Sequence, residues 1–77
     1  MTREKIGEAA GRVWETLAAK GEIGLSQLPR IAKLKSDVTY QALGWLARED
    51  KIQYRSRDGK VYISLSDGER QHHKSVN

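Results

Sequence analysis

The sequence predicts a small α+β domain, in which three helices, with a short strand between the first and the second, precede a β-hairpin. Three observations lead to this prediction. Apolar residues recur every three or four positions up to about residue 50, as in helices, and at alternate positions in the following segment, as in strands. A tight turn, Asp58-Gly59, divides that segment into two short runs. A chain of 77 residues has room for one such domain.

The first helix is expected from about Ile6 to Lys20, because Gly21 is a residue type that ends helices in the left-handed conformation. Gly7 and Gly11 lie beside its apolar face. Each costs about 0.5–1 kcal/mol relative to alanine inside a helix, so both predict that another surface comes close. A helix or tryptophan ring of the same molecule is one interpretation, and a second subunit is the other. The apolar face consists of Ile6, Ala10, Val13, Trp14 and Leu17.

A brief strand and a two-turn helix are predicted next. Residues 22–25 are too few for a helix and indicate a short strand. Ser26 is a suitable N-cap for a helix over residues 27–33. Pro29 falls in the first turn of that helix, where its missing N–H has no intrahelical partner in any case.

The third helix is predicted to begin at Ser36 as N-cap and to run to about Asp50, directly after a two-residue turn. Asp37 favours this start, because a carboxylate stabilises the positive end of the helix dipole. Its apolar face consists of Val38, Ala42, Trp45 and Leu46. Two helices joined by so short a connection are typical of a helix-turn-helix.

The two strands of the hairpin are predicted over residues 52–57 and 60–65. A two-residue turn pairs Arg57 with Lys60 and, step by step, Ile52 with Leu65. In this register Ile52, Tyr54, Val61, Ile63 and Leu65 face the helices, whereas Gln53, Arg55, Arg57, Lys60, Tyr62 and Ser64 face water. The hairpin is therefore the wing of a winged helix-turn-helix domain over residues 1–66. The polar residues 67–77 are expected to form a disordered tail.

Two segments of the sequence also resemble a known family. They are Ile6-Gly7 with Ala10-Gly11-x-Val13-Trp14, and, more specifically, Ala42-Leu43-Gly44-Trp45-Leu46-Ala47-Arg48-Glu49. The chain resembles, over roughly residues 3 to 66, a small family of bacterial and archaeal winged helix-turn-helix proteins classified as a domain of unknown function. The resemblance implies this fold, a one-domain cytoplasmic protein and a plausible homodimer. It implies no ligand or activity.

Several function classes find no support in the sequence. The chain has no cysteine, which removes disulfides, thiolate nucleophiles and zinc ribbons. No phosphate-binding glycine motif or catalytic triad is present, and the adjacent His72-His73 in the tail is a weak metal signal. The longest apolar run is far shorter than the roughly 20 residues that span a membrane, and no signal peptide is visible. We therefore expect a non-enzymatic cytoplasmic protein without a cofactor or a small-molecule substrate.

The charge distribution favours double-stranded DNA as the partner. The formal net charge is +4, and residues 1–25 contain four basic and four acidic residues, so the whole excess lies in residues 26–77. DNA-binding winged helices place the third helix in the major groove and the wing against the backbone or minor groove. The predicted DNA-binding residues are Lys33, Lys35, Ser36, Thr39, Tyr40, Gln41, Arg48, Arg55, Arg57 and Lys60. Asp37 and Glu49 oppose this role, and the wing cations could instead prevent aggregation of an exposed strand.

A protein-interaction module or homodimer without DNA binding is the alternative. Gly44 lies in the middle of the third helix, where a glycine costs about 1 kcal/mol, and therefore predicts a close surface, either DNA or a partner's helix. The predicted interface consists of Leu43, Gly44, Trp45 and Ala47.

Overall fold

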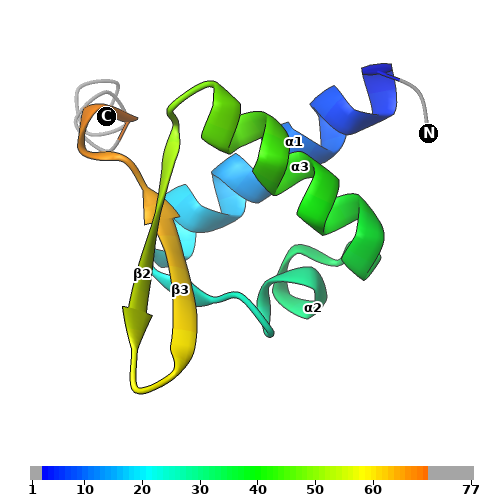
Figure 1. Ribbon diagram of the computed structural model, residues 1–77. Helices are drawn as coiled ribbons and strands as arrows, with labels where there is room; N and C mark the ends of the chain where they lie inside the picture. Colours follow the sequence, from blue (N-terminus) through cyan, green and yellow to red (C-terminus); the bar gives the residue numbers. More distant parts are fainter. Residues whose placement is uncertain (1–2, 70–77) are drawn as a thin grey trace.

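A helical subdomain and a three-stranded sheet make up the part of the chain that the structure describes, residues 3–69 of a computed structural model (Figure 1). The predicted α+β winged helix-turn-helix architecture is confirmed, with every element in the expected order. The elements are α1 (Arg3–Lys20), β1 (Ile23–Gly24), α2 (Leu28–Ala32), α3 (Ser36–Arg48), β2 (Ile52–Arg57) and β3 (Lys60–Leu65). Helix α3 crosses α1, and the hairpin of β2 and β3 projects beyond both helices (Figure 1).

The sheet is antiparallel with the order β1-β3-β2. The predicted register of the hairpin is confirmed over its whole length, from Ile52 opposite Leu65 to Arg57 opposite Lys60. The two-residue strand β1 pairs with β3 and places Ile23 opposite Ile63. As a result, the chain between α1 and α2 is attached to the wing.

The C-terminal ends of the helices agree with the prediction to within two residues, whereas α1 begins at Arg3, three residues before the expected Ile6. Helix α1 ends at Lys20 as expected, because Gly21 adopts φ +78° and donates its N–H to the Leu17 carbonyl at 2.8 Å. Helix α3 ends at Arg48 instead of near Asp50, since Asp50 itself adopts φ +60°.

Both predicted serine caps are wrong. The N-cap of α2 is Gln27 and that of α3 is Lys35, and neither helix has a side-chain cap. Ser26 therefore lies outside α2, whereas Ser36 is the first residue of α3. Lys35 occupies the N-cap position of α3 with an extended backbone, and its carbonyl accepts the first hydrogen bond of the helix, from the Thr39 N–H at 2.9 Å.

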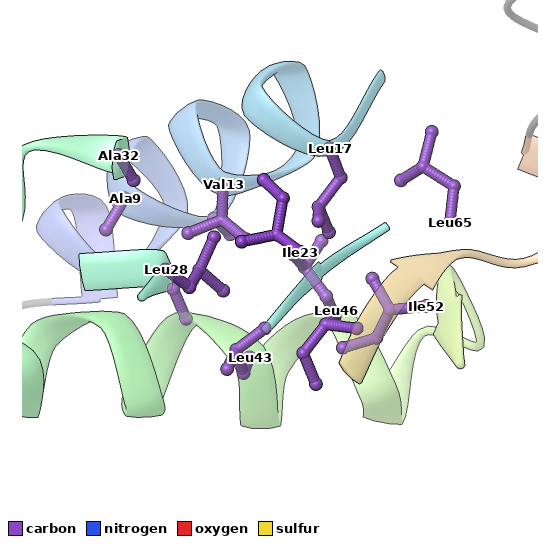
Figure 2. Packing of buried hydrophobic residues seen from close by; sticks show 13 residues of the cluster. Ala9, Val13, Leu17, Ile23, Leu28, Ala32, Leu43, Leu46, Ile52 and Leu65 are labelled. Carbon is purple, nitrogen blue, oxygen red and sulfur yellow. The ribbon is translucent and has the colours of Figure 1, made fainter. Parts of the chain in front are cut away.

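The core lies between α1, α3 and the sheet, where apolar side chains from all six elements converge (Figure 2). Val13, Leu28, Ala42 and Ile63 have no exposed surface. Leu28 comes from α2 and reaches the centre of this cluster (Figure 2). The short helix α2 is thus stabilised by its packing in the core, because it is too short to be stable alone.

Two hairpin residues differ from the predicted alternation. Tyr54 was expected to face the helices, but it is 51% exposed, because it lies on the edge strand β2, whereas Ile63 opposite it on the central strand β3 is fully buried. Its remaining burial raises the pKa of the phenol above the ordinary 10.0, because burial disfavours the charged phenolate. Ser64 was expected to face water, but it is buried, and its hydroxyl oxygen accepts a hydrogen bond from Gln53 Nε2 at 3.2 Å.

Residues 67–69 continue as a helical turn beyond the predicted domain end. Glu69 Oε1 accepts a hydrogen bond from Trp14 Nε1 at 2.8 Å, which ties this turn to α1. The ordered part of the domain therefore extends at least to Glu69. Residues 70–77, most of the predicted disordered tail, lie outside the described residues.

Candidate nucleic-acid interface

Helix α3 has a buried face and an exposed one. Thr39, Ala42, Leu43 and Leu46 form the buried face, which packs against the core. The exposed face consists of Ser36, Asp37, Tyr40, Gln41, Gly44, Trp45, Ala47 and Arg48. Most of the residues that the sequence assigned to DNA on this helix therefore reach the surface.

Two predicted contact residues of α3 are placed inside the protein. Thr39 is completely buried, and its hydroxyl donates to the Lys35 carbonyl at 2.8 Å, so it is not placed to bind a phosphate. Leu43 is 3% exposed and belongs to the core, so it cannot line an interface. The cause is the helical period, because positions 39, 43 and 46 share the side that faces the core.

A shallow hollow of about 380 Å³ lies where α3, the turn before α2 and the wing come together. Tyr40 of α3, 49% exposed, lines it together with Lys60 and Tyr62 of the wing. Ser26 and Gln27 line it from the turn before α2. These side chains supply hydroxyl, amide and ammonium donors, and the described lining contains no carboxylate. The hollow therefore suits an anionic group.

The sequence did not reveal Ser26, Gln27 and Tyr62 as parts of this site. Ser26 was assigned to capping, but it does not cap α2, and its side chain is exposed. Tyr62 reaches the hollow because β3 pairs with β1 at Gly24 and so comes next to the turn before α2. Because β1 and β3 are far apart in the sequence, no local sequence pattern predicts that they pair.

Five of the predicted cationic contacts are exposed and form no ion pair within residues 3–69. They are Lys33, Lys35, Arg48, Arg55 and Lys60; the sixth predicted cation, Arg57, is exposed too but forms an ion pair. Lys33 ends α2 with φ +60°, and Lys35 precedes α3, so two cations flank the turn of the helix-turn-helix. Exposed cations without a protein carboxylate are available for phosphates.

Arg57 is the exception among the wing cations. Its guanidinium forms an ion pair with Glu22, 35 residues earlier, and lies 4.5 Å from the centre of the Tyr62 ring. The Arg57 side chain is still 54% exposed. Glu22 thus neutralises part of the wing charge in the free protein and holds the Arg57 side chain across β3. No local sequence pattern indicates that Glu22 is the partner of Arg57.

A second hollow, called the α1–α3 groove here, lies on another side of the molecule and has a volume of about 800 Å³. Gly7, Gly11 and Trp14 line it from α1, and Trp45 lines it from α3. The other lining residues are Ala10, Glu15, Leu46, Lys51, Gly68 and Glu69. No atom of the described residues lies within 4 Å of where a Cβ of Gly7 or Gly11 would be. The expected intramolecular neighbour of these glycines is therefore not found among the described residues.

The predicted interface on α3 is divided between different sides of the helix. Trp45, 39% exposed, borders the α1–α3 groove, whereas Gly44 and Ala47 do not. At 100° per residue, Trp45 and Ala47 point about 160° apart around the helix. Nothing in the described structure comes within 4 Å of a Cβ at Gly44.

Neither a metal site nor a membrane-spanning helix is found in the described part of the chain. Residues 3–69 contain no group of three His, Cys, Asp or Glu side chains that could hold a metal ion. None of their helices is long and apolar enough to cross a bilayer. The His72-His73 pair lies outside the described residues.

Comparisons with known proteins agree with this fold. The family described as "Winged helix-turn-helix domain (DUF2582)" matches residues 1–65. Uncharacterized protein MJ1608 of Methanocaldococcus jannaschii is 44% identical over 64 residues, 79% of this chain and 90% of that protein. The NMR structure of BT2368 from Bacteroides thetaiotaomicron is 32% identical, with a TM-score of 0.77 over 88% of this chain and 83% of that one.

More distant solved structures share the fold alone. Reduced AbfR bound to DNA is 18% identical, with a TM-score of 0.72 over 95% of this chain and 59% of that one. Transcriptional regulators are also among the solved structures with this architecture.

Proposed function

This chain belongs to the family of winged helix-turn-helix domains that matches it, and we propose that it is a non-enzymatic module that binds double-stranded DNA. The observation that carries the proposal is the hollow between Tyr40 and Lys60, which contains hydrogen-bond donors and no described carboxylate. Cations without an ion pair to any residue of 3–69 lie on the turn and on the wing beside it. The two parts of a winged helix that meet DNA thus present a matching surface.

Phosphate contacts supply most of the affinity in this proposal. Lys33 and Lys35 at the turn, and Arg55 and Lys60 on the wing, contact phosphates and fix the position of the protein on the duplex. Tyr40 and Ser26 donate their hydroxyls to a phosphate in the hollow. The DNA complex of AbfR, which has the same fold, supports DNA as the partner class.

Base reading is a smaller part of the proposal. Gln41 is exposed on α3 and has the amide that pairs with an adenine edge in the major groove. Asp37 lies on the same exposed surface and repels phosphate. We therefore expect weak sequence preference and strong dependence on salt.

The test is a titration of a labelled mixed-sequence duplex with the protein, followed by fluorescence anisotropy at about 50 and about 200 mM salt. With about five phosphate contacts, the expected slope of log K against log salt is about −4.5, so affinity falls several hundred-fold between the two conditions. A single strand of the same sequence is the control, and it should show a shallower slope. Absence of saturable binding by the folded protein at the lower salt concentration would reject DNA as the ligand.

Removing the partner of Arg57 is expected to strengthen DNA binding. In Glu22→Gln the guanidinium loses its ion pair and becomes available to a phosphate. One additional phosphate contact should raise affinity roughly 5- to 10-fold at about 0.1 M salt and steepen the salt slope by about 0.9. Anisotropy titrations over a range of salt concentrations measure both effects.

A matched control separates this effect from net charge. Asp58→Asn makes the same charge change at the wing turn, where Asp58 forms no ion pair within the described residues and asparagine tolerates its φ of +51°. We expect this control to change the slope little, and the gain of Glu22→Gln to disappear in the double variant with Arg57→Ala. Equal gains from Glu22→Gln and Asp58→Asn would contradict a specific role for the ion pair.

A further inference from the structure

The outer edge of strand β2 is a row of backbone groups to which the described molecule adds no further strand. Strand β2 lies at an edge of the sheet, because the strand order is β1-β3-β2 (Figure 1). Its six residues contain no proline, and its register with β3 runs without a bulge from Ile52 to Arg57. Prolines and bulges are common features that block pairing at the edge of a sheet. The edge of β2 is therefore open to another strand.

The register identifies the backbone groups that point outward from this edge. In an antiparallel ladder, every second pair of residues exchanges N–H···O=C bonds, and the pair that closes a two-residue turn is one of these. Arg57 and Lys60 are that closing pair. Counting back along β2, Ser56 and Tyr54 belong to the other kind of pair. Their N–H and C=O groups are therefore directed away from β3.

The opposite side of β3 agrees with this alternation. Val61 is the partner of Ser56, and its carbonyl accepts the Leu25 N–H at 2.9 Å, so it points away from β2. Neither Ser56 nor Tyr54 forms a backbone hydrogen bond outside the ladder within residues 3–69. The outward donors and acceptors of these two residues are thus left to water or to a partner.

The side chains along the edge have different chemistry on the two faces of the sheet. Tyr54 lies on the same face as the buried Ile63 opposite it, yet it is 51% exposed and offers an aromatic surface at the edge. On the other face, Arg55 and Arg57 are exposed, and β2 contains no acidic residue. Arg57 is paired with Glu22, whereas Arg55 forms no ion pair within residues 3–69.

We propose that this edge binds an extended acidic segment of another protein, which adds to the sheet as a further antiparallel strand. A residue opposite Tyr54 exchanges backbone hydrogen bonds with it and lies on the same face, so an apolar side chain at that position packs against the tyrosine ring. The next residue lies opposite Arg55 on the other face, where a carboxylate forms an ion pair. The segment that fits therefore alternates acidic and apolar residues.

A second copy of the chain fits this edge poorly. Any pairing of two β2 edges through their outward groups places the odd-numbered residues of both copies on one face. In β2 these residues are Gln53, Arg55 and Arg57, so cations would meet without a carboxylate from either strand. Duplex DNA can contact Arg55 but has no row of N–H and C=O groups at strand spacing. Because Arg55 is also a proposed phosphate contact, a bound peptide should weaken DNA binding, and this consequence alone rests on the proposed function.

The experiment titrates the full chain with a peptide as long as β2, in which valine alternates with glutamate, and follows amide hydrogen exchange by NMR. In the free protein, the outward N–H groups of Tyr54 and Ser56 should exchange rapidly, while that of Arg55 is protected by β3. Near saturation with the peptide, exchange at Tyr54 and Ser56 should slow by at least about 10-fold. Unchanged exchange at both residues with peptide in the millimolar range would overturn the proposal.

Two methylated forms of the same peptide test the pairing. Valine lies opposite Tyr54 and Ser56 in the proposed register, so methylation of the valine nitrogens removes the N–H groups that face β2. Methylation of the glutamate nitrogens is the matched control, because those N–H groups point away from β2. We expect the first form to bind at least about 10-fold more weakly than the second. Any other order of affinities would overturn the proposed strand pairing.

Ser56→Pro makes the same test from the side of the protein. Proline is tolerated on an edge strand where the N–H points outward, so the variant should keep the circular dichroism of the wild type. It should bind the unmethylated peptide at least about 10-fold more weakly, whereas Ser56→Ala, which keeps the N–H, should stay within about 2-fold of the wild type. Arg55→Ala should cost about 2- to 5-fold, because it removes one exposed ion pair. Equal affinities of a folded Ser56→Pro and Ser56→Ala would contradict pairing at this edge, and neither result depends on DNA binding.

Discussion

The double variant Lys35→Gln with Lys60→Gln is expected to bind duplex DNA about 50-fold more weakly than the wild type at about 0.1 M salt. Lys35 lies at the start of α3 and Lys60 at the edge of the hollow on the wing, and neither has a carboxylate partner within residues 3–69. Each loses one phosphate contact in this variant. The slope of log K against log salt should therefore become shallower by about 1.8.

A control variant with the same loss of charge separates the effect of these two positions from the effect of net charge. Lys20→Gln with Lys51→Gln also removes two exposed lysines, but one is at the end of α1 and the other borders the α1–α3 groove. Neither lines the Tyr40–Lys60 hollow, so we expect a change of less than about 3-fold. Equal losses from the two double variants would show that only the net charge matters, and would reject the surface assigned here.

Local patterns were sufficient to predict the elements of this fold. The register of the hairpin follows from the Asp58-Gly59 turn and the alternation of apolar residues, and the structure has every predicted pair. The end of α1 was also predicted from a local feature, the glycine at position 21. The serine caps were wrong because a serine beside a helix start is a common cap, whereas the residue that adopts the cap geometry depends on the path of the backbone.

The functional surface could be predicted only in part, because it depends on contacts between distant segments. The exposure of the cationic side chains could be predicted from the sequence, since charged side chains stay at the surface. Tyr40 could be predicted from its position on the outer side of the third helix. The pairing of Arg57 with Glu22, by contrast, depends on β1 lying next to β3. The burial of Thr39 depends on how α3 is rotated against the core.

The glycines of α1 and α3 are a second case in which the sequence predicted a contact without identifying its partner. Gly7, Gly11 and Gly44 each predict that a surface comes close, and sequence alone favoured an intramolecular neighbour for the first two. The structure leaves all three Cβ positions open, so no contact with the described residues offsets the cost of these helical glycines.

Leu28→Ala is expected to lower the free energy of unfolding by about 2–5 kcal/mol, because it removes a large side chain from a site with no exposed surface. Helix α2 has only five residues and cannot persist without packing. Its other buried residues, Pro29 and Ala32, are smaller and fill less of the core. Since a domain of this size is marginally stable, such a loss is a large part of its total stability.

Urea denaturation followed by tryptophan fluorescence measures this loss. Leu34→Ala is the matched control, because it deletes the same atoms from a half-buried position after α2 and should cost about 1 kcal/mol. Equal costs at the two positions would contradict the central role of Leu28. Because the loss of α2 also displaces Gln27 from the hollow beside Tyr40, DNA affinity should fall along with stability in Leu28→Ala, whereas Leu34→Ala should retain it.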